Sequence, residues 1–172
     1  LLPTGIDTDT YEAGQAFAFV RREVGADLST HDWKEKSVIE KAMDGILALR
    51  DAQGTGLAFL SDFGLHEGGV ERDDKRTAYI TLLRCFSKTY TTNGEPGGQQ
   101  LGRSDYRFRL RPLDDAVSSG ALMREQADMR AGVRAFVTRE ARADACLHVE
   151  GDACVSACKP AEDGSGDEII RL

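Results

Sequence analysis

Apolar and polar residues alternate over several segments of the chain, and this alternation predicts β-strands. Tyr106, Phe108 and Leu110 alternate with three arginines, a pattern typical of a strand with one buried and one solvated face. The same period of two runs through residues 16–24. Residues 57–60 are apolar at every position, which predicts an inner strand of a sheet.

Further strands and one helix complete the predicted fold. Short strands are expected at 37–42, 46–50, 70–72, 77–85, 135–138, 146–150, 153–158 and 168–172, separated by turns. Asp114 and Asp115 are expected to cap a helix that runs to about residue 131. Its thin apolar stripe consists of Leu122, Gln126, Met129 and Val133. Together these elements predict an all-β sandwich with one helical connection.

Composition and charge restrict the class of protein. The 172 residues, 41% of them hydrophobic and 30% charged, suit a single globular domain over residues 1–172. A net charge of −7 argues against binding nucleic acid, which requires clustered Lys and Arg. The apolar runs, such as Ala16 to Val20, are much shorter than the roughly 20 residues of a membrane span, so no span is expected.

The cysteines and the N-terminus indicate the origin of the chain. Four cysteines are too few and too irregularly spaced for a secreted disulfide framework. Asn93, the only asparagine, precedes Gly94 and Glu95 and so forms no N-glycosylation acceptor. Both observations favour the cytoplasm. The start Leu1–Leu2–Pro3 lacks an initiating Met and a signal sequence, so we expect a fragment of a larger protein.

One group of residues has the chemistry of a zinc site. Cys146, His148, Cys154 and Cys158 are suitable ligands, but Cys154 and Cys158 lie about 13 Å apart along an extended strand, unlike a Cys-x2-4-Cys knuckle. Buried free thiols are the favoured interpretation, and no metal is expected in this chain.

The acidic residues give little support for catalysis. The neighbouring pairs Asp73–Asp74 and Asp114–Asp115 suit a turn and a helix cap better than the facing carboxyl groups of a glycosidase. Glu67 beside His66, in what is predicted to be a Gly-flanked loop, is a better candidate for part of a site, although a solvated loop is the alternative.

The arginines at 107, 109 and 111 form a basic stripe on the alternating strand. They could contact an acidic neighbour or ligand, but a solvated strand face is the favoured interpretation.

Several segments, in the same order, resemble the C-terminal half of glycoside hydrolase family 38, which contains α-mannosidases and mannosylglycerate hydrolases. They are LLPTG at 1–5, FAFVRREV at 17–24, DW-K-E at 32–35, GLAFLSDFGLHEGGVERDDKRTAYITLLRC at 56–85, LGRSDYRFRLRP at 101–112 and VSACKPAEDGSGDEIIRL at 155–172. The resemblance implies a β-supersandwich of the galactose-mutarotase-like kind. It also implies an upstream zinc-binding α/β barrel, which holds the zinc ligands, the Asp nucleophile and the general acid, followed by a helical bundle. Neither is expected in this chain.

The expected function is therefore that of a non-catalytic β domain of an α-mannosidase-type enzyme, whose partners are its own upstream catalytic and helical domains. The parent reaction that the resemblance implies is zinc-dependent, retaining hydrolysis of α-mannosides. A free-standing carbohydrate-binding module is the alternative. His66, Glu67 and Trp33 are the candidate carbohydrate contacts, with Tyr11 and Tyr90 as further aromatic candidates in loops.

Overall fold

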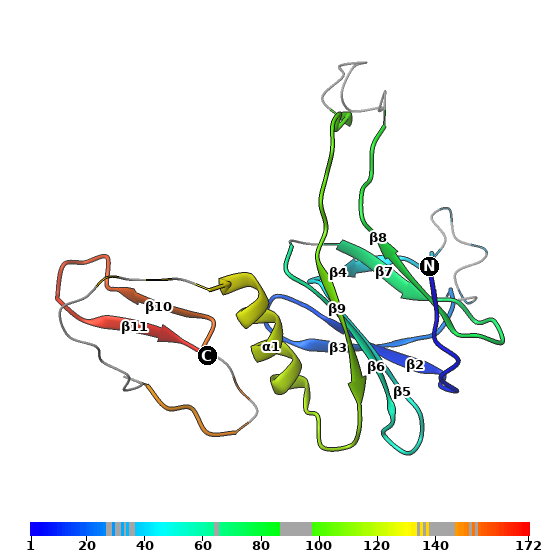
Figure 1. Cartoon of the computed structure of the whole chain (residues 1–172), viewed down its shortest axis with the longest axis horizontal. Helices are drawn as coiled ribbons and strands as arrows, with labels where there is room; N and C mark the ends of the chain where they lie inside the picture. Colours follow the sequence, from blue (N-terminus) through cyan, green and yellow to red (C-terminus); the bar gives the residue numbers. More distant parts are fainter. Residues whose placement is uncertain are drawn as a thin grey trace. The chain divides into compact units, whose positions relative to one another are not determined.

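The computed structural model of the chain describes residues 1–26, 29, 32, 34, 37–63, 66–86, 98–133, 135, 137, 147–151, 153 and 155–172 (Figure 1). Two compact units are present, Leu1–Asp115 and Ala116–Leu172. Strands in antiparallel sheets predominate, and the described part contains one α-helix, so the all-β prediction is confirmed. The prediction of one domain over 1–172 stays a prediction.

Five strands of the first unit form one antiparallel sheet. In spatial order they are β3 (Phe19–Glu23), β2 (Thr10–Gly14), β5 (Ile46–Arg50), β6 (Gly56–Ser61) and β9 (Phe108–Leu113). Hairpin partners lie side by side, β2 against β3 and β5 against β6. The inner strand predicted at 57–60 is part of β6, in which Ala58, Phe59 and Leu60 are buried.

The second sheet of this unit has four antiparallel strands. They are β1 (Leu2–Pro3), β8 (Thr77–Thr81), β7 (His66–Val70) and β4 (Lys41–Met43), in that spatial order. The strand expected over 77–85 is shorter than predicted because the β-ladder ends at Thr81. The expected loop around residue 67 is wrong, since β7 already begins at residue 66.

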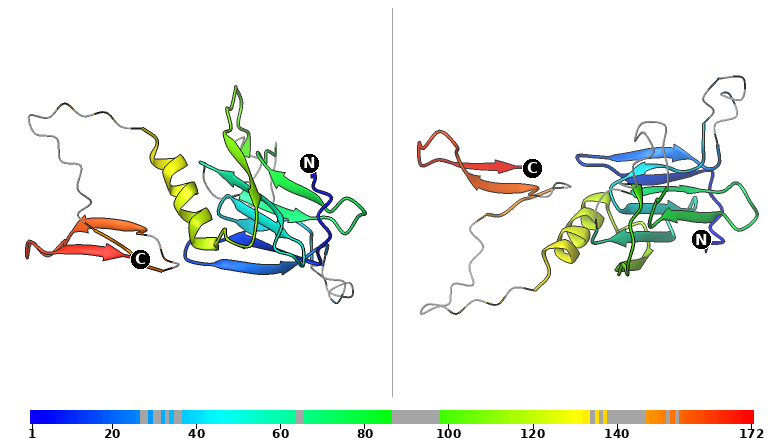
Figure 2. Two further views of the ribbon diagram at one scale, coloured as in Figure 1. Left: turned by 60° about the horizontal axis from the view of Figure 1, so that its bottom comes forward. Right: turned by 90° about the horizontal axis from the view of Figure 1, so that it is seen from above.

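Side chains from both sheets form a common core. The two sheets are thus the layers of a sandwich, and their strands can be followed in Figure 2. The buried members are Tyr11, Ala13, Val24, Met43, Leu47, Leu49, Phe59, Val70 and Ala78, and Leu2, Ile6 and Ile80 pack against them. Each large apolar side chain buried in this way contributes about 1.5–3 kcal/mol to folding. Their contacts across the sheets therefore stabilise the unit.

The faces of β9 match the prediction, but their burial does not. The register pairs Leu110 with Phe59 and Phe108 with Ser61, so both apolar residues lie on the face turned toward the other sheet. However, Phe108 is 53% and Leu110 44% exposed. The expectation that they are core residues is wrong, because β9 is the last described strand of its sheet and the core is open there.

The second unit contains the helix and a hairpin. Helix α1 (Ser119–Ala131) starts after Ser118, whose side chain accepts a hydrogen bond from the N–H of Ala121. The cap is therefore Ser118 and not the predicted Asp114–Asp115 pair. Strands β10 (Ala157–Pro160) and β11 (Glu168–Arg171) pair antiparallel. Leu122 and Gln126 of the predicted stripe are buried, whereas Val133 lies beyond the helix and is fully exposed.

Candidate functional site

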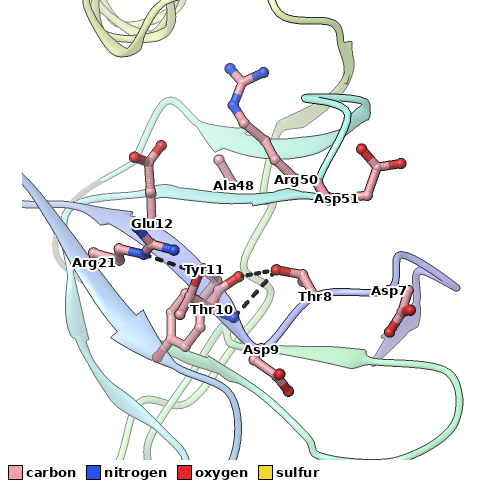
Figure 3. Close-up of a pocket in the computed structure, with 11 residues that line it drawn as sticks. Asp7, Thr8, Asp9, Thr10, Tyr11, Glu12, Arg21, Ala48, Arg50 and Asp51 are labelled. Atoms are coloured by element: carbon pink, nitrogen blue, oxygen red, sulfur yellow. Dashed lines mark hydrogen bonds between the residues drawn. The ribbon is translucent and has the colours of Figure 1, made fainter.

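A polar cleft of about 500 Å³ lies over β2, β3 and β5 of the first unit (Figure 3). Its lining residues are Asp7, Thr8, Asp9, Thr10, Tyr11, Glu12, Arg21, Ala48, Arg50, Asp51 and Ala52. Strand alternation places Thr10 and Glu12 on the face opposite to the core residues Tyr11 and Ala13. The register sets Glu12 between Arg21 and Ala48. The cleft thus combines acidic and basic groups on the outer face of the five-stranded sheet.

Hydrogen bonds fix the floor of this cleft. The Nε of Arg21 donates to the Oγ1 of Thr10 at 3.1 Å. The hydroxyl of Thr8 donates to the carbonyl of Thr10 at 2.9 Å and accepts a hydrogen bond from the N–H of Thr10 at 3.3 Å (Figure 3). These bonds hold the hydroxyl and guanidinium groups in place before any ligand binds.

The opposite wall of the cleft is the turn after β5. Arg50 donates to the carbonyls of Gly54 and Asp114 at 3.1 and 2.6 Å. The Oδ1 of Asp51 accepts from the N–H groups of Gln53 and Thr55, both at 2.9 Å. Both side chains therefore stabilise the turn, and their charges shape the cleft from its rim.

The backbone of Tyr11 lines the cleft, because the ring belongs to the core and the residue is only 2% exposed. Burial raises the pKa of Tyr11, and the guanidinium of Arg22, its neighbour across the β2–β3 ladder, partly opposes this shift. The expectation that Tyr11 is an exposed loop aromatic is wrong, because residues 10–14 form a strand. Tyr11 therefore offers no stacking surface for a sugar.

A second pocket, of about 380 Å³, surrounds Glu67. Its lining residues are Ala42, Glu67, Thr81, Leu82, Leu83, Arg84 and Gln100. Glu67 lies opposite Thr81 in the β7–β8 ladder and forms an ion pair with Arg84. The side chains of Glu67 and Arg84 are 33% and 66% exposed, so the pair contributes little to stability. Together with the Gln100 amide, this pair can donate to and accept from the hydroxyl groups of a ligand.

Of the predicted site residues, His66 and Glu67 both lie in β7. Adjacent positions of a strand belong to opposite faces, so positions 66 and 67 do not share a face, and the register places position 66 opposite Met43. Trp33 and Tyr90 lie outside the described residues. The assignment of His66, Glu67 and Trp33 to a carbohydrate site stays a prediction, and Glu67 lines the second pocket.

The candidate metal set is described only in part. Cys146 and Cys154 lie outside the described residues, and the side chain of His148 is 83% exposed. Cys158, on β10, is an exposed free thiol, so the prediction of buried thiols is wrong for this residue. Among the residues with a described placement, no three His, Cys, Asp or Glu side chains are grouped to hold a metal ion.

The cleft over β2 is absent from the sequence-based prediction, although the sequence carries a signal for it. Thr10 and Glu12 alternate with Tyr11 and Ala13, a period of two over five residues that precedes the first predicted strand.

Comparisons with known proteins give no relative. No protein family, curated protein or solved structure matches the chain. Within the described part of the chain, no helix has the length and apolar character of a membrane span.

Proposed function

We propose that this chain is a non-catalytic β-sandwich region of a glycoside hydrolase resembling the family 38 α-mannosidases. The observation that carries the proposal is the ordered series of resembling segments, of which the longest, 56–85, contains β6, β7 and β8. This segment contributes strands to both sheets, so the resemblance covers the framework of the sandwich. The parent enzyme would use zinc held by an upstream domain, and that domain and the helical bundle would be the partners of this chain.

The surroundings of the acidic residues support a non-catalytic role. A glycosidase holds two carboxyl groups roughly 5–9.5 Å apart across the sugar. Here Asp73 accepts hydrogen bonds from Thr77 within its own turn, and Glu67 is paired with Arg84. Both carboxylates are engaged by neighbouring side chains, which suits structural roles better than proton transfer.

The test of this proposal is an assay of the purified chain with an aryl α-mannoside, with and without added zinc. We expect no turnover in either condition. Zinc-dependent turnover would contradict the non-catalytic role. Reading the coding sequence upstream of Leu1 tests the family separately, because an upstream region without an Asp- and His-bearing barrel would contradict the enzyme assignment.

A free-standing carbohydrate-binding module is the second candidate, and the pocket around Glu67 favours it. Its carboxylate, guanidinium and amide groups are the kind that orient sugar hydroxyls. Calorimetric titration with manno-oligosaccharides distinguishes the candidates. If this chain is a carbohydrate-binding module, Glu67→Gln weakens binding of the manno-oligosaccharide. Glu12→Gln, in the polar cleft over β2, leaves that binding unchanged. Absence of heat at millimolar sugar would exclude the module.

We also propose a cytoplasmic location. The irregular spacing of four cysteines and the lack of an N-glycosylation acceptor support it.

A further inference from the structure

The polar cleft over β2, β3 and β5 contains two charged side chains that have no ionic partner among the described residues. They are Glu12 on β2 and Arg21 on β3, directly opposite each other in the β2–β3 ladder. Within the described part of the chain, the Glu12 carboxylate accepts no hydrogen bond, and the Arg21 side chain makes a single one, to Thr10. The carboxylate and the two terminal nitrogens of the guanidinium are therefore available to a ligand.

The hydrogen bond to Thr10 keeps Arg21 away from Glu12. Opposite charges that face each other across two strands normally attract each other. The Nε of Arg21 instead donates at 3.1 Å to the Oγ1 of Thr10, which lies two positions before Glu12 on the same face of β2. Figure 3 shows the carboxylate of Glu12 directed away from this guanidinium. Both charges thus line the cleft without neutralising each other.

The other charged groups of the cleft are engaged within the protein. Arg76 pairs with Asp7 at 3.7 Å and with Asp9 at 3.8 Å. Arg72 pairs with Asp9 at 3.1 Å. The two charged side chains of the turn after β5 are hydrogen-bonded to backbone groups. A ligand therefore meets one available carboxylate, that of Glu12, and one guanidinium with available nitrogens.

The size and charge of the cleft restrict its ligand. Its volume of about 500 Å³ lies in the range of about 300–1,000 Å³ that is usual for small-molecule sites. Ala48, beside Glu12 in the β2–β5 ladder, has only a methyl group and leaves room next to the carboxylate. The planar guanidinium of arginine binds a carboxylate through two parallel hydrogen bonds, and a carboxylate accepts from an ammonium group. A ligand with one group of each charge satisfies both side chains.

From this geometry we propose that the polar cleft binds a small zwitterion, with its ammonium group at Glu12 and its carboxylate at Arg21. The bond to Thr10 holds the Arg21 guanidinium in place before binding, which reduces the entropy that binding costs. A ligand with a single charge leaves one of the two side chains without a partner. The proposal goes beyond the proposed function and does not depend on the glycosidase assignment.

NMR titration of the isotopically labelled chain tests the proposal. The probes are glycine, γ-aminobutyrate and ε-aminocaproate, three zwitterions of increasing length. Each is compared with the carboxylic acid and with the amine of the same chain length, which carry one charge each. We expect at least one zwitterion to bind about tenfold more tightly than both of its single-charge analogues. The amide resonances that shift should belong to β2, β3 and β5.

Two isosteric variants assign the two charges separately. In Glu12→Gln the zwitterion should bind no more tightly than the carboxylic acid, because the partner of its ammonium group is lost. In Arg21→Gln it should bind no more tightly than the amine. The matched control, Glu67→Gln in the second pocket, keeps both preferences.

The comparison of probes on the intact chain needs no variant, so it tests the proposal even if a variant fails to fold. Affinities of the zwitterions that do not exceed those of the single-charge analogues would overturn the proposal. Preferences that persist in both Glu12→Gln and Arg21→Gln, or shifts centred on the pocket around Glu67, would overturn it as well.

Discussion

The rings of Phe59 and Phe108 lie 5.3 Å apart between centroids, tilted by 31°, and this contact joins β6 to the edge strand β9. Their environments differ, since Phe59 is 6% exposed and Phe108 53%. One aromatic pair thus spans the boundary between the core and the open side of the sandwich.

We expect Phe59→Ala to reduce the free energy of unfolding by about 3–5 kcal/mol, the usual cost of emptying a phenylalanine site in a core. Phe108→Ala should cost about 1–2 kcal/mol, because roughly half of its surface is already in water. Urea unfolding of both variants measures the difference. Equal losses would show that β9 is packed more tightly than this structure indicates.

A pair of glycines in β7 gives a second prediction. A Cβ at position 69 would lie 2.2 Å from the carbonyl oxygen of Ile39, whereas one at position 68 would lie 2.8 Å from the flexible Sδ of Met43 and 3.0 Å from the carbonyl oxygen of Tyr79. We expect Gly69→Ala to cost more than the roughly 1–3 kcal/mol typical of overpacking, and Gly68→Ala to stay within that range. Thermal unfolding of the two variants compares them directly. A smaller loss at position 69 would be inconsistent with the close approach of Ile39.

The period-two patterns predicted the positions of the strands better than they predicted which side chains are buried. The strand predicted at 106–111 overlaps β9, although β9 begins two residues later and continues through Pro112 to Leu113. The pattern also identified the side that faces the other sheet, because alternation is a local property of the chain. The exposure of Phe108 depends on which strand lies at the end of the sheet, and strand order involves contacts far apart in sequence. The strand β7 was not predicted from the sequence, because the need for its glycines also depends on a contact outside the strand. Gly68 and Gly69 suggested a loop, whereas close approach of Ile39 requires glycine within a strand.

The start of helix α1 provides a third prediction. The Ser118 side chain accepts from the N–H of Ala121 at 3.2 Å, so Ser118→Ala should cost about 1 kcal/mol of helix stability. The sequence favoured Asp114–Asp115 as the cap. Asp115→Ala should therefore leave the helix unchanged, and it serves as the control. Hydrogen exchange of the α1 amides reports both effects. Faster exchange in Asp115→Ala alone would favour the earlier cap.

The candidate site was predictable only as single residues. Glu67 could be selected from the sequence, but its partner Arg84 lies 17 positions away and is brought to it across the β7–β8 hairpin. The polar cleft combines residues of β2, β3 and β5 with a turn, so its composition depends on the order of strands in the sheet. Neither combination is visible in the linear spacing of charged residues.

The turn before β8 predicts a specific loss of stability in acid. The hydroxyl of Thr77 donates to one carboxylate oxygen of Asp73 at 2.7 Å, and its N–H donates to the other at 2.9 Å. These bonds favour the ionised form and lower the pKa of Asp73 below its ordinary 3.8. Because the pKa is lower in the folded state, the stabilisation is present above pH 3.8 and disappears as the pH falls through the folded value.

Asp73→Asn should therefore be less stable than the natural chain at pH 6, and the difference should shrink steadily below pH 3.8. Urea unfolding at a series of pH values from 6 to 2.5 measures this difference. Asp74→Asn, at the exposed neighbouring position of the same turn, is the matched control and should show a small difference that does not depend on Thr77. Thr77→Val removes the hydroxyl that donates to Asp73, so it should reproduce part of the pH dependence of stability seen in Asp73→Asn. A stability difference between Asp73→Asn and the natural chain that stays constant from pH 6 to 2.5 would show that Thr77 does not hold Asp73 in its ionised form.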